Sequence, residues 1–183
     1  MVTLLLIITN LVVYLLELAY GGQAACQEYG LIPANFAHSA QIGPLFSSLF
    51  FHDPSSLLHL GGNMVFLAVF GPIVERALGH FRFLGLYLLA GAWAGLIHVL
   101  VDPSATDALV GASGAIFGIM TVAAVIRPRL LPFVVLFIGL NVWHAFVGAD
   151  GSVSFGAHLG GFFAGLFFAI WLRLTGDEAL EVA

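Results

Sequence analysis

Two strings in this sequence place a serine and a histidine among small residues, in a way that suits acyl-transfer chemistry. Ser113 lies in Gly-Ala-Ser-Gly at 111–114, and His158 lies in Gly-Ala-His-Leu-Gly-Gly at 156–161. A serine hydroxyl is a weak nucleophile until a base takes its proton, and histidine is the usual base near neutral pH. Each residue alone also has a structural interpretation, as helix packing for the serine string and as a histidine bonded to a backbone carbonyl for His158.

The residues near the serine string could stabilise a developing negative charge. Gly111 and Gly114 let a backbone approach the hydroxyl closely, and a helix that begins at Ser113 offers free N–H groups to an oxyanion. His59 and Asn63 are four residues apart, so they share one helical face, and both can donate hydrogen bonds. The alternative for this pair is a polar contact that joins two membrane helices.

No carboxylate is placed to orient His158. Asp150 is the nearest in sequence, but it falls in an expected loop where water can solvate it. We therefore expect a Ser–His dyad rather than a triad.

The single cysteine, Cys26, excludes an internal disulfide and a cysteine-based zinc site, and we interpret it as a small apolar filler or a loop thiol.

Metal and cofactor chemistry is not expected. The His-Glu-x-x-His string of zinc proteases is absent from the sequence. The paired intramembrane aspartates of aspartyl proteases are also absent, because none of the aspartates falls inside an apolar stretch. The remaining histidines, at 38, 52, 80, 98 and 144, are expected to have structural roles.

The composition places these residues in a membrane protein. Of the 183 residues, 61% are hydrophobic and 8% are charged, whereas a soluble domain has about 25% charged residues. The net charge is −5 and no lysine is present, which argues against a nucleic-acid partner. The bilayer is the expected surrounding of this chain.

Six apolar stretches are expected to form helices that cross the bilayer. They span residues 3–20, 57–74, 83–101, 113–126, 131–147 and 157–174. Most approach the roughly 20 residues that a spanning helix needs, and the short fourth one is admissible if protein surrounds it. The first stretch lacks the basic segment of a signal peptide, so we expect it to remain as a helix. The sequence thus predicts one all-α, polytopic domain over residues 1–183.

The long segment at 21–54 is expected to be an outer loop that lies in the membrane interface, because it is rich in phenylalanine and leucine. The positive-inside rule predicts the orientation of the bundle. All five basic residues fall on one side of a six-helix arrangement: Arg76, Arg82, Arg127, Arg129 and Arg173. That side and both termini are then cytoplasmic, and the second, fourth and sixth stretches begin on the outer side.

This topology puts the polar residues at one depth. His59, Asn63, Ser113 and His158 all lie near outer helix starts. Glycines at 156, 160, 161 and 165 form a smooth face on the sixth stretch, and those at 111, 114 and 118 are expected to pack against it. That packing would bring His158 within reach of Ser113.

The motifs together resemble the rhomboid family of intramembrane serine proteases. The matching strings lie at 59–64 (His-Leu-Gly-Gly-Asn-Met), 111–118 and 156–161, with further family-like strings at 31–36 and 71–79. They cover nearly the whole chain in the family's order.

The resemblance implies a six-helix core with a water-filled active site that opens to the outside. It implies that Ser113 is the nucleophile, that His158 is the general base, and that Asn63 and His59 line the oxyanion hole. Substrates of such enzymes are single-span membrane proteins cut in or beside a helix that unwinds easily. Some relatives have a tyrosine stacked on the histidine, where this chain has Phe117.

Other features stay open at this point. Many relatives carry a Trp-Arg pair where this chain reads Gln-Ile-Gly-Pro-Leu-Phe at 41–46, which puts the anchoring of that segment in doubt. Helix 131–147, with Phe133, Phe137 and Trp143, and the loop at 148–155 are candidates for a substrate gate. A prokaryotic cell membrane is the expected location. The physiological substrate and the oligomeric state are not determined.

Two other classes of function compete with the protease. A small transporter or channel would use a glycine-rich short helix and buried polar groups to line a pathway. A non-catalytic rhomboid-like binder would hold membrane clients without cutting them. Neither alternative requires a serine and a histidine as a pair.

Overall fold

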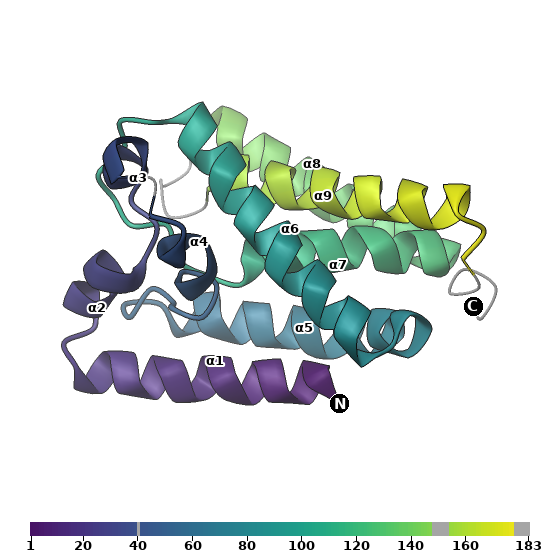
Figure 1. Ribbon diagram of the computed structural model, residues 1–183, viewed down its shortest axis with the longest axis horizontal. Helices are drawn as coiled ribbons and strands as arrows, with labels where there is room; N and C mark the ends of the chain where they lie inside the picture. Colours follow the sequence, from purple (N-terminus) through teal and green to yellow (C-terminus); the bar gives the residue numbers. More distant parts are fainter. Residues whose placement is uncertain (40, 148–153, 178–183) are drawn as a thin grey trace.

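The computed structural model describes residues 1–39, 41–147 and 154–177. In this part of the chain all the regular secondary structure, apart from one isolated β-bridge, is helical (Figure 1). Four helices are long and apolar enough to cross a membrane: α1 (Val2–Ala19), α5 (Leu57–Leu78), α6 (His80–Val101) and α9 (Phe155–Leu174). Two shorter apolar helices, α7 (Ser113–Ile126) and α8 (Leu131–Val147), accompany them, with a 3-10 turn, η1 (Pro128–Leu130), between. The prediction of an all-helical membrane bundle is confirmed.

Two consecutive helices extend beyond the apolar stretches that predicted them, so that one residue separates their ends. The stretch expected at 57–74 continues to Leu78 as α5, and the stretch expected at 83–101 begins at His80 as α6. Gly79 alone separates the two helices, and its positive φ of 77° lets the chain turn there. Arginines that were assigned to a loop therefore lie in terminal helical turns.

The segment expected as a long outer loop contains three short helices. These are α2 (Gln23–Tyr29), α3 (Pro33–Ser39) and α4 (Gly43–Ser47). Leu45 and Leu49 are buried against α6, whereas Phe46 of the same segment is exposed. The segment's apolar content is thus partly used for packing inside the protein, and not only at a membrane interface.

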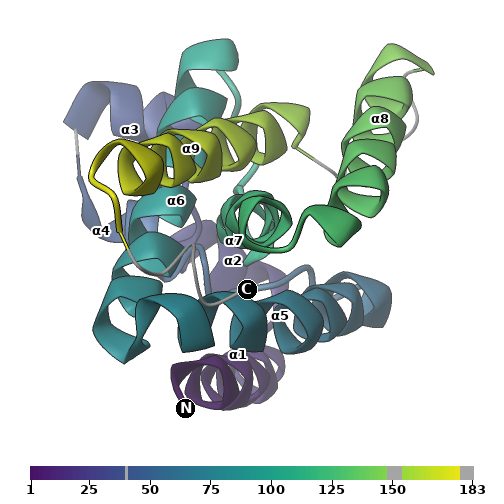
Figure 2. The ribbon, with the colours of Figure 1, turned by 90° about the vertical axis from the view of Figure 1, so that its right-hand side faces the viewer.

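The short helix α7 runs through the centre of the bundle. In Figure 2 it is seen end-on, with α5, α6, α8 and α9 around it. Only Ser113 and Val125 of its residues are not fully buried. A 14-residue helix is too short to cross a bilayer in contact with lipid, and the surrounding helices remove that requirement.

Close backbone contact joins α7 to α9. A methyl group added at Gly161 would collide with the carbonyl oxygen of Gly114, and one added at Gly165 would collide with the carbonyl oxygen of Gly118. The predicted pairing of these two helices is therefore observed, although only part of the predicted glycine face takes part in it.

The other two glycines of α9 face a different helix. Gly160 approaches Ile97 and the backbone of Ala94 on α6, and Gly156 approaches the backbone of His98. Successive helical residues point about 100° apart, so neighbouring glycines at 160 and 161 serve two partners. The expectation that all four glycines face α7 was wrong for these two.

Helix α1 is held to the bundle by polar contacts and shows apolar side chains to the lipid. Its buried face carries Thr3, Asn10, Tyr14 and Glu17 together with Leu6, while most of its leucines are exposed. The Oγ1 of Thr3 donates to the Glu75 carboxylate of α5 at 2.6 Å, and its backbone N–H donates at 2.9 Å. A buried carboxylate that accepts several hydrogen bonds is a strong link between two helices in an apolar medium.

Substitution of Gly161 by alanine tests the packing of α7 on α9. The added methyl group meets the Gly114 carbonyl oxygen, so we expect Gly161→Ala to lower the free energy of unfolding by about 1–3 kcal/mol. Gly85→Ala on α6 is the matched control, because nothing lies within 4 Å of its added methyl group. Alanine there is expected to be neutral or stabilising by about 0.5–1 kcal/mol. Unfolding in detergent micelles measures both, and equal effects would contradict this packing.

Candidate active site

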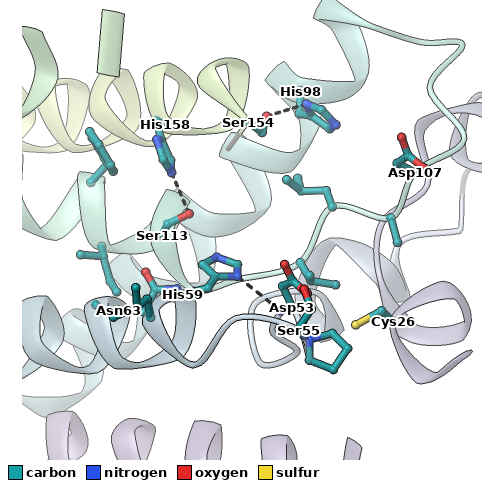
Figure 3. A pocket seen from close by; sticks show the side chains of 18 of the residues that line it. Cys26, Asp53, Ser55, His59, Asn63, His98, Asp107, Ser113, Ser154 and His158 are labelled. Carbon is teal, nitrogen blue, oxygen red and sulfur yellow. Dashed lines mark hydrogen bonds between the residues drawn. The ribbon is translucent and has the colours of Figure 1, made fainter. Parts of the chain in front are cut away.

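A cavity of about 650 Å³ opens at the end of the bundle where α5, α7 and α9 begin. It is lined by residues from all three helix starts, including His59 and Asn63 of α5, Ser113 of α7 and His158 of α9 (Figure 3). The structure thus brings together the four polar residues that the topology placed at one depth. The start of α1 and the end of α9 lie at the opposite end of the bundle (Figure 1).

Ser113 begins α7, and the backbone before it is fixed by a glycine. Gly111 has a φ of 122°, which residues with a side chain rarely adopt, and its N–H donates to the carbonyl oxygen of Ser48 at 2.9 Å. A methyl group at Gly111 would lie 2.8 Å from Nε2 of His59. The glycine therefore both turns the chain into α7 and leaves room for the histidine of α5.

The serine and the histidine are in hydrogen-bond contact. The Oγ of Ser113 lies 2.9 Å from Nε2 of His158, within the range in which a hydroxyl proton passes to a base. The ring of Phe117 stacks on His158, with centroids 4.3 Å apart and planes 16° apart. Phe117 is one helical turn after Ser113 on α7, so the serine and the ring stacked on His158 come from the same helix.

His158 also contacts a third side chain, which the sequence analysis did not select. Nδ1 of His158 lies 2.6 Å from Oδ1 of Asn141, on α8. The sequence analysis expected His158 to have no carboxylate partner and named no other residue beside it, whereas an amide lies at that position. A signal was present in the sequence, because an asparagine inside an apolar helix is costly unless it has a partner.

His59 and Asn63 present hydrogen-bond donors at the cavity. The backbone N–H of Asp53 donates to Nδ1 of His59 at 3.3 Å, so the proton of a neutral His59 ring is carried by Nε2. Nε2 is the atom that lies beside Gly111. The buried Nδ2 of Asn63 has no hydrogen-bond partner among the described residues, which is rare for a buried donor and requires an explanation.

Three of the other histidines, at 52, 80 and 98, have neighbours that suit structural roles. His98 Nδ1 lies 2.7 Å from Oγ of Ser154, the residue that caps the start of α9. The buried ring of His52 packs 5.2 Å from that of His59. Burial, with a smaller contribution from His59, lowers the pKa of His52 to about 4, so it is neutral at pH 7. His80 contacts Glu75 at 2.6 Å.

The charged residues around the cavity mouth are all acidic. Asp53, Asp102 and Asp107 line it, and none of its described lining residues is Arg or Lys. No group of three or more His, Cys, Asp or Glu side chains is arranged to hold a metal ion in the part of the chain that the structure describes. Asp150, the side chain of His144 and most of the predicted gate loop at 148–155 lie outside the described residues.

Comparison with known proteins gives one consistent family. A family model described as the Rhomboid domain matches residues 39–175. RHOMBOID-like protein 5 of Arabidopsis thaliana is 30% identical over 160 residues, which are 80% of this chain and 50% of that protein. Rhomboid protein 1, mitochondrial, of Saccharomyces cerevisiae is 30% identical over 168 residues, 83% of this chain and 47% of that protein.

A bacterial relative is named as a protease. Rhomboid protease GluP of Bacillus subtilis is 35% identical over 118 residues, which are 59% of this chain and 23% of that protein. The chain spans half or less of the length of each of these three relatives. The similarity therefore concerns the membrane domain that holds the cavity.

The single cysteine next to this site is expected to be unreactive in the folded protein. Cys26 is 2% exposed and its thiol donates to Oε1 of Glu17 at 2.9 Å. Burial and that carboxylate raise the pKa of the thiol to about 12, so almost no thiolate is present at pH 7.5. We expect maleimide to label native protein slowly and unfolded protein completely.

A cysteine at an exposed position provides the control for this labelling. Ser104 is exposed, and Ser104→Cys in a Cys26→Ala background should react rapidly without unfolding. Rapid labelling of Cys26 in folded protein would contradict the burial described here.

Proposed function

This chain belongs to the rhomboid family, and we propose that it is an intramembrane serine endopeptidase that cuts transmembrane segments of other membrane proteins. The observation that carries the proposal is the 2.9 Å contact between Oγ of Ser113 and Nε2 of His158 inside a cavity of the bundle. Membership of the family supports proteolysis in general, and the contact supplies a nucleophile with its base.

In the proposed reaction Ser113 attacks the carbonyl carbon of a substrate peptide bond. His158 takes the hydroxyl proton on Nε2 as the Oγ–C bond forms, and the carbonyl oxygen becomes an oxyanion. His158 then returns the proton to the leaving nitrogen, the C–N bond breaks, and an acyl-enzyme remains on Ser113. Water, deprotonated by the same histidine, hydrolyses the ester and restores the serine.

The proposed oxyanion hole consists of three donors from two helices. Asn63 supplies Nδ2, which is buried and has no partner among the described residues. His59 supplies Nε2–H, since its Nδ1 accepts from Asp53. The N–H of Ser113 at the start of α7 is the third, because the first N–H groups of a helix have no intrahelical acceptor. An acceptor on the substrate would explain why Asn63 lacks one in the protein.

Substrates are proposed to be single-span membrane proteins that reach the cavity from the bilayer. A peptide bond in a regular helix is shielded by its neighbours, so the substrate has to unwind locally before Ser113 reaches the carbonyl. Helix α8 is the proposed gate: Phe133 and Phe137 pack at a tilt against Phe66 of α5, with ring centroids 6.2 and 4.6 Å from it. Trp143 of the same helix is exposed. Separation of these rings would open the bundle between α5 and α8.

The proposed orientation has both termini in the cytoplasm and the cavity open to the outer side. The five arginines support it, because the helix ends that carry them lie opposite the cavity. The relatives include plant, mitochondrial and bacterial proteins, so the expected prokaryotic cell membrane has support from the bacterial relative only.

Replacement of the nucleophile tests the proposed function directly. We expect Ser113→Ala to abolish cleavage of a model single-span substrate in proteoliposomes, because no other hydroxyl contacts His158 among the described residues. His158→Ala should have the same effect, since the serine then has no base. A fluorophosphonate probe should label the wild type, but neither variant.

The control is the thermal unfolding of each variant, which should match the wild type. Cleavage that persists in Ser113→Ala would contradict the proposal. Folded wild type that binds a membrane client without cutting it would favour the non-catalytic binder, and substrate flux that is independent of Ser113 would favour a transporter.

Removal of the proposed oxyanion donor should slow the chemistry without abolishing it. Loss of one such donor typically costs about 10²–10³ in rate, so we expect Asn63→Ala to lower kcat by that factor. Asn35→Ala provides a matched control, because Asn35 is exposed on α3 and does not line the cavity. An Asn63 variant with the wild-type kcat would remove this residue from the oxyanion hole.

A further inference from the structure

We propose that Asn141 is a positioning residue for the base, so that Ser113, His158 and Asn141 act as a hydrogen-bonded trio rather than a pair. The inference rests on the proposed function, because it concerns the same histidine. It goes beyond the dyad by assigning a role to a residue of α8, the helix at the edge of the bundle (Figure 2).

The amide of Asn141 is held in one orientation by two hydrogen bonds. Its Nδ2 donates to the carbonyl oxygen of Phe137, one turn earlier on α8, at 2.8 Å. Its Oδ1 is thereby directed at Nδ1 of His158, 2.6 Å away. A carbonyl oxygen cannot donate, so the end of the amide that faces the histidine is an acceptor.

This acceptor selects the tautomer of the histidine that catalysis needs. Oδ1 of Asn141 requires the ring proton to be on Nδ1, which leaves the lone pair of Nε2 facing the Ser113 hydroxyl at 2.9 Å. In the other tautomer Nε2 would carry the proton, and it could not accept one from the serine. Asn141 thus prepares His158 as a base before the substrate arrives.

The same contact stabilises the charge that develops during the reaction. When His158 takes the serine proton, its Nδ1–H still donates to the amide oxygen, and a hydrogen bond to a charged donor is stronger than one to a neutral donor. An amide does this without placing a second charge in the apolar bundle, where an ionised carboxylate would be costly. Papain-like proteases use an asparagine beside their histidine in a comparable arrangement.

Helix α8 also packs against the ring that stacks on His158. The ring of Phe137 lies 5.3 Å from that of Phe117, which in turn stacks on His158. The backbone carbonyl of Phe137 is also the group that fixes the Asn141 amide. One turn of α8 therefore contacts His158 directly through Asn141 and packs against Phe117, the ring of α7 that covers one face of the histidine.

Two substitutions at Asn141 separate its acceptor from its donor. Asn141→Leu has a similar shape and neither group, and we expect it to lower kcat about 10- to 100-fold with KM unchanged. The rate of fluorophosphonate labelling should fall by the same factor. Asn141→Asp keeps an acceptor toward His158, loses the donor to Phe137 and adds a carboxylate. The charge of that carboxylate would pair with the imidazolium formed on His158 during the reaction, so this variant should retain kcat within about threefold. Leu89→Ala, at an exposed leucine of α6 that does not line the cavity, should leave kcat unchanged.

Two outcomes would overturn the inference. One is a wild-type kcat in folded Asn141→Leu. The other is an equal loss in folded Asn141→Leu and Asn141→Asp, which would show that an acceptor facing His158 does not account for the effect. Thermal unfolding midpoints show whether each variant is folded.

Nitrogen NMR of the wild type tests the contact without any variant at Asn141. In protein labelled with ¹⁵N-histidine, the His158 signals, identified by their loss in His158→Gln, should show the ring proton on Nδ1. A ring protonated on Nε2 overturns the inference even if Asn141→Leu does not fold. If the wild type shows no Ser113-dependent cleavage, the proposed protease fails, while the tautomer still reports on the Asn141 contact.

Discussion

The backbones of α7 and α9 approach so closely that no side-chain carbon fits between Gly114 and Gly161 or between Gly118 and Gly165. In a bilayer the hydrophobic effect does not drive two helices together, and small residues allow the close van der Waals contact that does. Because Ser113 and His158 begin these two helices, the distance between them follows from this contact. Their 2.9 Å hydrogen bond is a consequence of helix packing at least as much as of local sequence.

The hydrogen-bond partners of the polar groups inside the apolar bundle indicate which of these groups have a structural role. Glu75 accepts from Thr3, Glu17 accepts from Cys26, and Asn141 bonds both to its own helix and to His158. In an apolar medium each of these contacts satisfies a group whose burial would otherwise cost several kcal/mol. Asn63 differs, because its buried Nδ2 has no partner in the described part of the chain and it lies at the cavity. A hydrogen-bond donor without a protein partner at a cavity is suited to bind a ligand, whereas a donor paired inside the bundle stabilises the fold.

The helices that hold the site differ in how firmly they are packed. Helix α7 is buried on all sides, so Ser113 has a rigid support. Helix α8 has an exposed face that includes Leu136, Leu140 and Trp143, and it meets α5 through stacked phenylalanines. A base whose orientation depends on α8 links the proposed gate to the proposed chemistry, since movement of α8 would act on His158 through Asn141.

The sequence by itself determined the class of the protein and selected the two residues of the proposed dyad. Composition indicated a membrane chain, apolar runs placed the long helices within a few residues of their observed ends, and the Ser113 and His158 strings stood at helix starts. The arginines predicted that these starts share one end. These features are local or periodic, so a single chain records them directly.

Only the tertiary structure decided which helix faces which. Gly160 and Gly161 are neighbours in sequence, yet they contact α6 and α7 respectively, and no pattern along α9 names those partners. The same applies to Asn141, which reads as one polar residue in an apolar run until α8 is seen beside His158. A hydrogen bond between side chains 17 residues apart depends on the relative rotation and depth of two helices. Those quantities are set by packing over the whole bundle and leave no local mark in the sequence.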